Sequence, residues 1–148
     1  MTLAMTKSER ETFLAAVHIG VISIADHPRA PLTVPIWYDY RPGGELCLIT
    51  ERHSRKGRLL ADLQRFSLCV QEEAPPYKYV SVEGPVVAIE IADVERDLRP
   101  MAHRYLGPEM GDRYVAATAE ERERGESVLV RMTPEQWLSA DYSKQYAL

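Results

Sequence analysis

The pattern of hydrophobic and polar residues predicts mostly β-strands in the first ninety or so positions of the chain. Runs rich in β-branched and aromatic residues, bounded by glycine and proline, are typical of strands. Six such runs cover residues 17–25, 32–40, 45–50, 66–71, 77–91 and 127–132. The segment 41–44 supplies a tight connection between the second and third runs. Gly84 and Pro85 interrupt the fifth run, so we expect a bend or bulge there, because proline cannot donate to a ladder.

Apolar residues recur at helical spacing in the remaining segments. Ser8 and Glu11 have the spacing of a capping box, so a short helix is expected to begin near residue 8. Further helices are predicted at 54–63, 93–106 and 111–125. The segment 133–136 also has capping-box form, although Trp137 could equally extend the last strand. Six strands in meander order with short helical inserts predict a mainly β fold, a small six-stranded antiparallel barrel.

Composition and charge narrow the class of protein. The 148 residues are 45% hydrophobic and 27% charged, which is typical of one globular domain spanning residues 1–148. The formal net charge of −4 argues against binding to nucleic acid, because phosphate backbones attract basic surfaces. No apolar run is long enough to cross a membrane, and the N-terminus does not resemble a signal peptide. We therefore expect a cytoplasmic protein.

Cysteine and histidine show no metal-site pattern. Cys47 and Cys69 each lie inside an apolar run without CxxC spacing, which favours reduced thiols in the core. The four histidines are widely spaced, so no metal site is expected. His53 lies in a basic stretch where it could contact a ligand, but an exposed loop histidine is the preferred interpretation.

A cluster of cations marks the predicted junction between the third strand and the helix at 54–63. Residues 51–58 contain four cations and one acid. Thr50 and Ser54 add hydroxyl groups, and Ser54 stands where the helix would begin. Hydroxyl oxygens, backbone N–H groups and the positive end of the helix dipole together favour a phosphate monoester. A solvated basic face on a surface helix is the competing interpretation of this charge run.

The same junction resembles a known motif. Thr50, Ser54, Arg55 and Lys56, followed by an amphipathic turn and the strand at 65–70, look like the flavin-phosphate motif of the pyridoxamine 5′-phosphate oxidase-like FMN-binding split-barrel superfamily. The N-terminal helix and the strands at 20–24, 32–38 and 78–85 also follow the order of that superfamily, over residues 8–92. The resemblance implies a split β-barrel and a homodimer with two equal cofactor pockets between the protomers.

The resemblance also implies roles for ten residues. Those expected to bind the phosphate are Thr50, Ser54, Arg55 and Lys56. Those expected to border the isoalloxazine ring are Val34, Pro35, Ile36 and Trp37, and those expected to reach it across the interface are Lys78 and Tyr79. The aromatic clusters at 37–40 and 77–79 have a competing interpretation, since tyrosine and tryptophan are also common in a barrel core or a dimer interface.

One departure from the superfamily bears on activity. Authentic pyridoxamine phosphate oxidases end in arginines, a histidine and a Leu-x-Pro terminus that hold the substrate phosphate, and residues 137–148 do not resemble that ending. Oxidation of vitamin B6 is therefore not expected. The chain instead resembles a short branch of the superfamily, several members of which use the deazaflavin coenzyme F420. The phosphate motif does not separate F420 from FMN, because both carry a phosphate on the ribityl chain.

The function implied by the resemblance is that of an FMN- or F420-dependent oxidoreductase. Such an enzyme transfers a hydride or electrons to a small organic substrate, and the redox chemistry belongs to the ring, so no general acid or base is named. Two other interpretations stay open. One is a non-catalytic protein that binds a flavin or haem for storage, sensing or stress response, and the other is a dimeric scaffold with an empty site.

Overall fold

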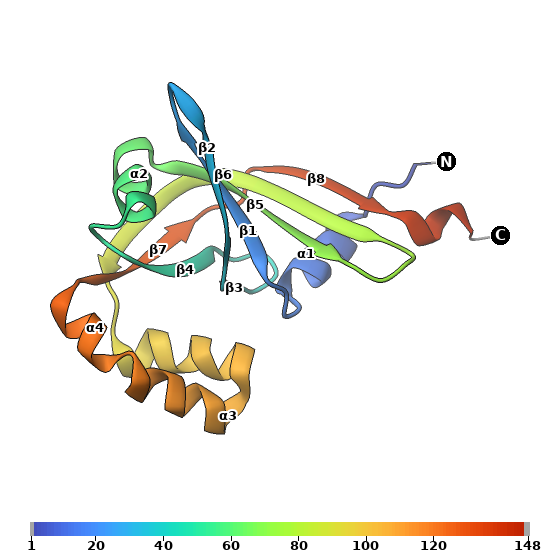
Figure 1. Ribbon diagram of the computed structural model, residues 1–148. Coiled ribbons are helices and arrows are strands. Elements are labelled where there is room, and N and C mark those ends of the chain that lie inside the picture. The colour runs from blue at the N-terminus through green and yellow to red at the C-terminus, as the bar shows by residue number, and fades with distance from the viewer. Residues whose placement is uncertain (1, 147–148) are drawn as a thin grey trace.

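The computed structural model describes residues 2–146. Among these residues, eight strands form one antiparallel sheet in the order β2-β1-β5-β6-β7-β4-β3, and β8 pairs with β6 beside this path. The strands are β1 (Gly20–Asp26), β2 (Arg29–Ile36), β3 (Asp39–Tyr40), β4 (Leu46–Glu51), β5 (Arg65–Glu72), β6 (Lys78–Ile91), β7 (Ser127–Met132) and β8 (Gln136–Asp141). Figure 1 shows these strands wrapping around a common interior, with the long strand β6 running through both halves of the sheet.

The prediction of six strands is wrong, because two strands were not separated by the pattern. The predicted strand at 32–40 is broken at Tyr38, whose backbone N–H donates to the Tyr105 hydroxyl at 3.0 Å rather than to a neighbouring strand. The segment after residue 133 forms strand β8 and not a helix, with Trp137 paired to Val82. The predicted strands at 45–50, 66–71 and 127–132 are confirmed to within one residue at each end.

Strand β6 joins the two halves of the sheet. Its first half pairs with β5 and β8, and its second half pairs with β7. The expected irregularity is present, but the register shifts between Val86 and Ala88 rather than at Gly84. Gly84 has a different role, since a Cβ there would lie 1.9 Å from the carbonyl oxygen of Thr133. Only glycine allows the β7–β8 connection to pass this close to β6.

Two of the helices lie against the barrel. Helix α1 (Lys7–Ala15) begins with a capping box, but the pair is Thr6 and Glu9 rather than Ser8 and Glu11. Thr6 Oγ1 accepts the Glu9 N–H at 3.2 Å, and Glu9 Oε1 accepts the Thr6 N–H at 2.8 Å. Helix α2 (Arg55–Leu63) starts where the sequence predicts.

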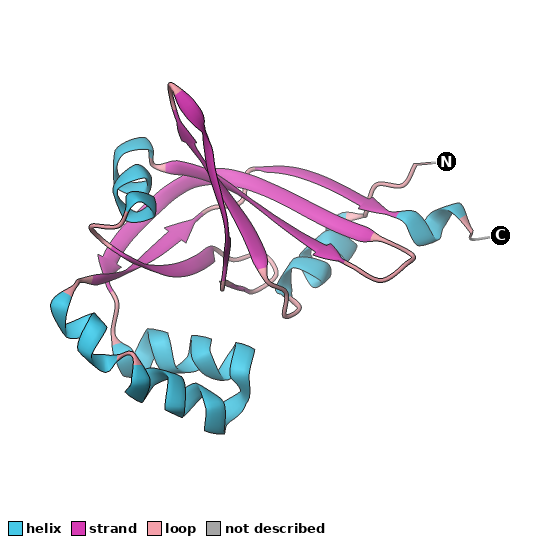
Figure 2. Ribbon diagram, viewed as in Figure 1, coloured by secondary structure: helices cyan, strands magenta, loops and turns pink. Residues whose placement is uncertain are grey.

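A layer of helices lies below the sheet (Figure 2). It contains the π-helical turn η1 (Val94–Leu98), α3 (Arg99–Ala117) and α4 (Ala119–Arg124), and a short 3-10 turn η2 (Tyr142–Gln145) follows β8 elsewhere in the fold. Helix α3 is broken at Gly107, whose φ of 81° lies in the left-handed region. The chain reverses there, so the two halves of α3 run side by side (Figure 1). With this layer the fold is mixed α and β rather than mainly β with short inserts.

The core lies between the strands and the two barrel helices. Its fully buried side chains include Ile22, Leu48, Leu68, Val80 and Val130 from the strands, with Leu14 from α1 and Leu60 from α2. Alternating burial along β4 and β5 places these side chains inward at every second residue. No helix among residues 2–146 combines the length and apolarity needed to cross a bilayer.

Two residues of α3 fasten the helical layer to the barrel. The Arg104 guanidinium donates to the carbonyl oxygen of Tyr38 at 3.1 Å and to that of Ala15 at 3.1 Å. The Tyr105 hydroxyl lies 2.7 Å from the carbonyl oxygen of His18 and 3.1 Å from that of Tyr38. The layer is therefore held at the end of α1 and at the entrance to β1, next to the site described below.

Candidate functional site

A cavity of about 500 Å³ lies between the sheet and the helical layer. The residues that line it from the barrel side include Pro35, Ile36, Trp37, Ile49, Thr50 and Lys56. Those that line it from the helical side include Leu98, Met101, Tyr114, Thr118, Glu121 and Arg122. Five of the ten residues assigned from sequence are thus brought together around one space.

Thr50 and Lys56 form the polar end of the barrel wall. Thr50 is buried near the end of β4, in register with Val128 of β7. Lys56 lies in the first turn of α2 and is half-buried, and burial lowers the pKa of its ammonium group. It forms no ion pair within residues 2–146. A cation partly removed from water without a counter-ion costs free energy, so this wall favours an anionic ligand.

Ser54 shapes the junction between β4 and α2. Its hydroxyl donates to the carbonyl oxygen of Glu51 at 2.7 Å and accepts the N–H of Gly57 at 3.0 Å. It is the N-cap of α2, as expected, and it does not line the cavity. Gly57 allows the turn to close, since a Cβ there would lie 2.2 Å from the Glu51 carbonyl oxygen. The predicted contact of Ser54 with a phosphate stays a prediction.

The charge cluster is largely compensated by residues far along the chain. Arg55 Nε donates to Asp26 Oδ2 at 2.9 Å, and Arg52 Nε lies 3.0 Å from Glu126 Oε2. Neither arginine lines the cavity. The Glu51 carboxylate accepts the backbone N–H of Glu126 at 2.9 Å and that of His53 at 2.6 Å, which lowers its pKa. Of the four cations in the basic stretch, Lys56 alone lines the cavity in this part of the chain.

Aromatic rings form the wall beside Pro35 and Ile36. Trp37 stacks on Tyr105 with ring centroids 5.1 Å apart and planes inclined by 5°. Tyr114 lies on the cavity side, 5.1 Å from Trp37 and inclined by 49°. This cluster is therefore part of a cavity wall, and the predicted contact of Trp37 with a planar ring stays a prediction. Val34 does not line the cavity, and it packs against the hydrophobic core instead.

Lys78 and Tyr79 lie at the start of β6, where they pair with Asp141 and Ala140 of β8. Neither residue lines the cavity of its own chain. Their predicted contact with the cofactor requires a second copy of the chain, and it stays a prediction.

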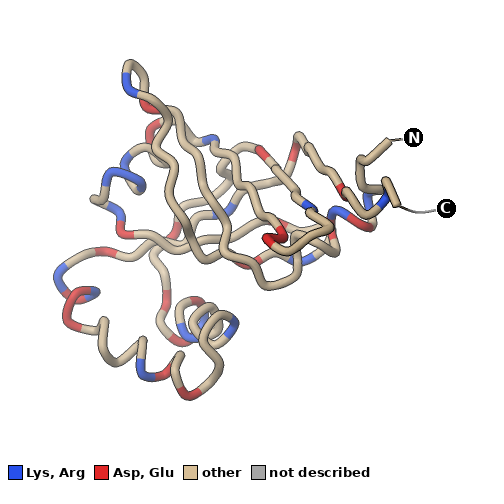
Figure 3. The backbone as a smooth tube through the Cα atoms, turned by 45° about the vertical axis from the view of Figure 1, so that its right-hand side comes forward, with Lys and Arg blue, Asp and Glu red and all other residues tan. Residues whose placement is uncertain are grey.

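The helical wall is the part of the site that the sequence did not reveal. It contributes Met101, Tyr114, Thr118 and Arg122, none of which belongs to the phosphate motif. The helical spacing at 93–125 identifies the helices, but nothing in that spacing shows which face meets the barrel. Figure 3 shows acidic and basic positions interspersed along this layer. Such a pattern is typical of a solvated helix surface.

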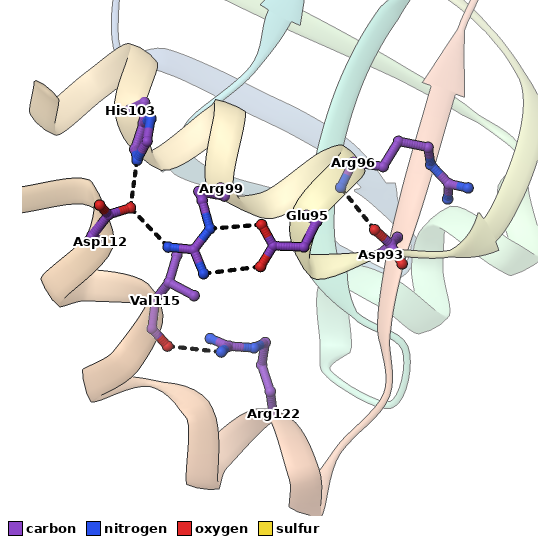
Figure 4. A network of polar contacts seen from close by, with 8 residues as sticks. All are labelled: Asp93, Glu95, Arg96, Arg99, His103, Asp112, Val115 and Arg122. Carbon is purple, nitrogen blue, oxygen red and sulfur yellow. Dashed lines mark hydrogen bonds and ion pairs between the residues drawn. The ribbon is translucent and has the colours of Figure 1, made fainter. Parts of the chain in front are cut away.

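Ion pairs brace the two halves of α3 against each other (Figure 4). Arg99 Nε lies 2.9 Å from Glu95 Oε2, and Arg99 Nη1 lies 2.7 Å from Asp112 Oδ1. The same Asp112 oxygen lies 2.6 Å from His103 Nε2. His103 and then Arg99 lower the pKa of the Asp112 carboxyl. The network fixes the wall that carries Met101 and Tyr114.

A second cavity, of about 690 Å³, lies on the other side of Met101 and is lined by Cys47 and Arg131 among others. Burial raises the pKa of the Cys47 thiol, and Arg131 Nη1 donates to its sulfur at 3.4 Å. None of the ten residues assigned from sequence lines this space. Although it is larger, it is not the phosphate site that the motif predicts.

The antiparallel sheet and the helices that pack on it define a split-barrel fold. Residues 6–141 match the family described as pyridoxamine 5′-phosphate oxidase, so the chain belongs to that family and has its FMN-binding split-barrel fold. No curated protein sequence matches the chain.

Three solved structures show the same fold. A conserved hypothetical protein from Mycobacterium tuberculosis has a TM-score of 0.77 at 21% identity, covering 99% of this chain and 91% of that one. An F420 reductase has a TM-score of 0.68 at 17% identity, covering 86% and 94%. A FAD-binding protein from Mesorhizobium loti has a TM-score of 0.57 at 22% identity, covering 91% and 93%. These similarities concern the fold, and the family includes flavin- and F420-binding reductases.

Proposed function

We propose that this chain is an oxidoreductase that binds the phosphate of FMN or coenzyme F420 at Thr50 and Lys56. The observation that carries the proposal is the Lys56 ammonium, half-buried beside a cavity and without an ion-pair partner among the described residues. A phosphate dianion would supply the missing counter-charge, and the buried Thr50 adds a hydroxyl donor.

The apolar part of the cavity suits a planar ring. Trp37 and Tyr114 offer aromatic surface, and Ile36 and Met101 add aliphatic contacts. When bound, a flavin or deazaflavin supplies the hydride or electron transfer. The chain's own residues position the ring, exclude water from it and leave room for a small organic substrate. The F420 reductase among the similar structures supports the deazaflavin, and the FAD-binding protein supports a flavin.

We also propose that two copies of the chain form a homodimer through the outer face of β2, β1, β5, β6 and β8. The register aligns one outward row across these strands, made of Pro35, Val21, Cys69, Ser81 and Leu138. Val21 and Leu138 are 39% and 63% exposed, so this row offers aliphatic surface to a partner. Pro35 also lines the cavity, so a second copy seated on this row would lie beside the cofactor.

A second candidate is a protein that binds a flavin without turning over a substrate. The FAD-binding protein from Mesorhizobium loti, which has the same fold, supports this candidate. Haem is less well supported, because the described cavity residues include Met101 but neither histidine nor cysteine.

The test begins with the visible spectrum of the purified protein, which separates flavin, deazaflavin and haem. Titration of cofactor-free protein with FMN and riboflavin then measures the contribution of the phosphate. Titration with F420 and its deazaflavin core measures the contribution of the phosphate together with the groups attached to it. We expect at least one phosphorylated ligand to bind far more tightly than its phosphate-free form. Equal affinities would contradict the proposed site. Reduction of the bound cofactor followed by mixing with candidate acceptors separates the enzyme from the binding protein.

A further inference from the structure

The charge of the proposed ligand exceeds the charge that the motif supplies. The phosphate monoester of FMN carries about −1.5 to −2 charges at neutral pH. Lys56 contributes one positive charge at the cavity wall. Arg55 is paired with Asp26, and Arg52 lies against Glu126, so neither is free to compensate a second negative charge. A second cation in the same cavity would therefore improve the charge balance of a bound dianion.

Arg122 is a cation in the opposite wall of the same cavity. It is half-buried, and its guanidinium is held by neutral acceptors: Nη2 donates to the carbonyl oxygen of Val115 at 2.7 Å, and Nη1 donates to Thr118 Oγ1. Figure 4 shows the bond between Arg122 and Val115. A guanidinium has five N–H donors. The two contacts orient the group, and the remaining donors are available to a ligand.

This arrangement sets Arg122 apart from the other arginines of the described chain. Eight have a carboxylate partner: Arg52, Arg55, Arg65, Arg96, Arg99, Arg104, Arg113 and Arg131. Of the arginines without a carboxylate partner, Arg10 lies over the Trp137 ring. Four others are exposed: Arg29, Arg41, Arg58 and Arg124. Arg122 is the half-buried arginine of residues 2–146 that lines this cavity and forms no ion pair within the described residues.

The acids that line the cavity leave this charge available. Glu51 accepts two backbone N–H groups, and Glu126 lies against Arg52. Glu121 is exposed at the rim. None of these carboxylates forms an ion pair with Arg122 within the described residues.

We propose that Arg122 is the second cation of the anion site, and that it binds the phosphate of the ligand together with Lys56. This inference rests on the proposed function and adds a residue from outside the phosphate motif. The helical layer then takes part in binding the phosphate as well as covering the ring, so the two walls close on one anion.

The experiment compares phosphorylated and phosphate-free ligands on two variants. Arg122→Gln should weaken the binding of FMN by roughly tenfold to a hundredfold, because a charge-assisted contact is lost, while riboflavin should bind as it does to the unaltered protein. If the protein selects the deazaflavin, F420 and its phosphate-free core replace this pair. Arg124→Gln is the matched control, since Arg124 lies on the same helix and is exposed outside the cavity.

Arg122→Lys tests whether the charge of the side chain, rather than the folding of the helical layer, accounts for the loss. It keeps the positive charge and removes the planar guanidinium. We expect it to weaken FMN less than Arg122→Gln does, with an unchanged melting temperature. An equal loss for FMN and riboflavin on Arg122→Gln would overturn the inference, and so would no loss for either. If Lys56→Ala weakens FMN and Arg122→Gln does not, the inference fails while the proposed function stands. If the unaltered protein binds no phosphorylated ligand, both fail.

Discussion

The Tyr105 hydroxyl lies 2.7 Å from the carbonyl oxygen of His18, so this hydrogen bond joins the helical layer to the residues just before β1. The same hydroxyl accepts the N–H of Tyr38 at 3.0 Å, and its ring supports Trp37 from behind. The position of the aromatic wall therefore depends on a residue that does not itself line the cavity.

Tyr105→Phe keeps the ring and removes the hydroxyl. We expect a loss of about 1–3 kcal/mol in the free energy of unfolding, because two backbone groups lose a half-buried partner. Urea denaturation measures this loss. Tyr77→Phe is the control, since Tyr77 is exposed and its hydroxyl has no hydrogen bond within the described residues. Equal stability of the two variants would contradict the fastening role of Tyr105.

Lys56 and Arg58 provide a matched pair two residues apart on α2. Lys56→Ala should weaken the binding of the phosphorylated cofactor by about 2–3 kcal/mol, because the half-buried cation faces the cavity. Arg58→Ala should leave the affinity nearly unchanged, because Arg58 is exposed and does not line the cavity. Isothermal titration with both variants measures the difference. Equal losses of affinity would mean that the cations of residues 51–58 attract the ligand only by long-range electrostatics and that Lys56 makes no specific contact.

The ion pairs of Asp112 should weaken in acid. The pKa of this carboxyl in the folded protein lies below its usual value of 3.8, with His103 as the larger cause and Arg99 as the second. A depressed folded pKa gives a stabilisation that is present above the usual pKa and is lost as the pH falls through the folded value. Melting curves of the unaltered protein and of Asp112→Asn should therefore differ at neutral pH and converge below the usual pKa. A constant difference across this range would exclude the carboxylate as the cause.

The outward row on the sheet predicts the effect of a charge at Leu138. Leu138→Glu should convert the proposed homodimer to a monomer, since an unpaired carboxylate would be buried in the interface. Light scattering after size-exclusion chromatography gives the mass. Leu63→Glu is the control, because Leu63 is also exposed but lies at the end of α2, outside this row. A monomeric unaltered protein would refute the dimer directly.

Local sequence patterns predicted where helices and strands lie. They did not predict which residues from distant parts of the chain pack against those helices and strands. The cap at Ser54 and the strand at 127–132 follow from short-range rules, and both are confirmed. The charge excess around Lys56 was overestimated, because the partners of Arg55 and Arg52 come from positions far away in the chain. No local count of charges includes such partners.

The helical wall shows the same limit. Helices at 93–125 follow from their periodicity, but the orientation of Arg122 depends on where the chain turns back at Gly107 and on the Arg104 contacts with the barrel. The sequence left residues 133–138 undecided between helix and strand for a related reason, since the pairing of β8 with β6 accompanies the close approach at Gly84 and does not follow from the local pattern.

The reversal at Gly107 gives the fold a place where its size can vary. A Cβ at this position would meet nothing within 4 Å, so the loop is free of the packing that fixes the barrel. Insertions or deletions at this tip would lengthen or shorten the two half-helices without disturbing the strands. The barrel wall of the cavity would in this way be combined with covers of different reach, and the space between the two walls would change on an unchanged frame.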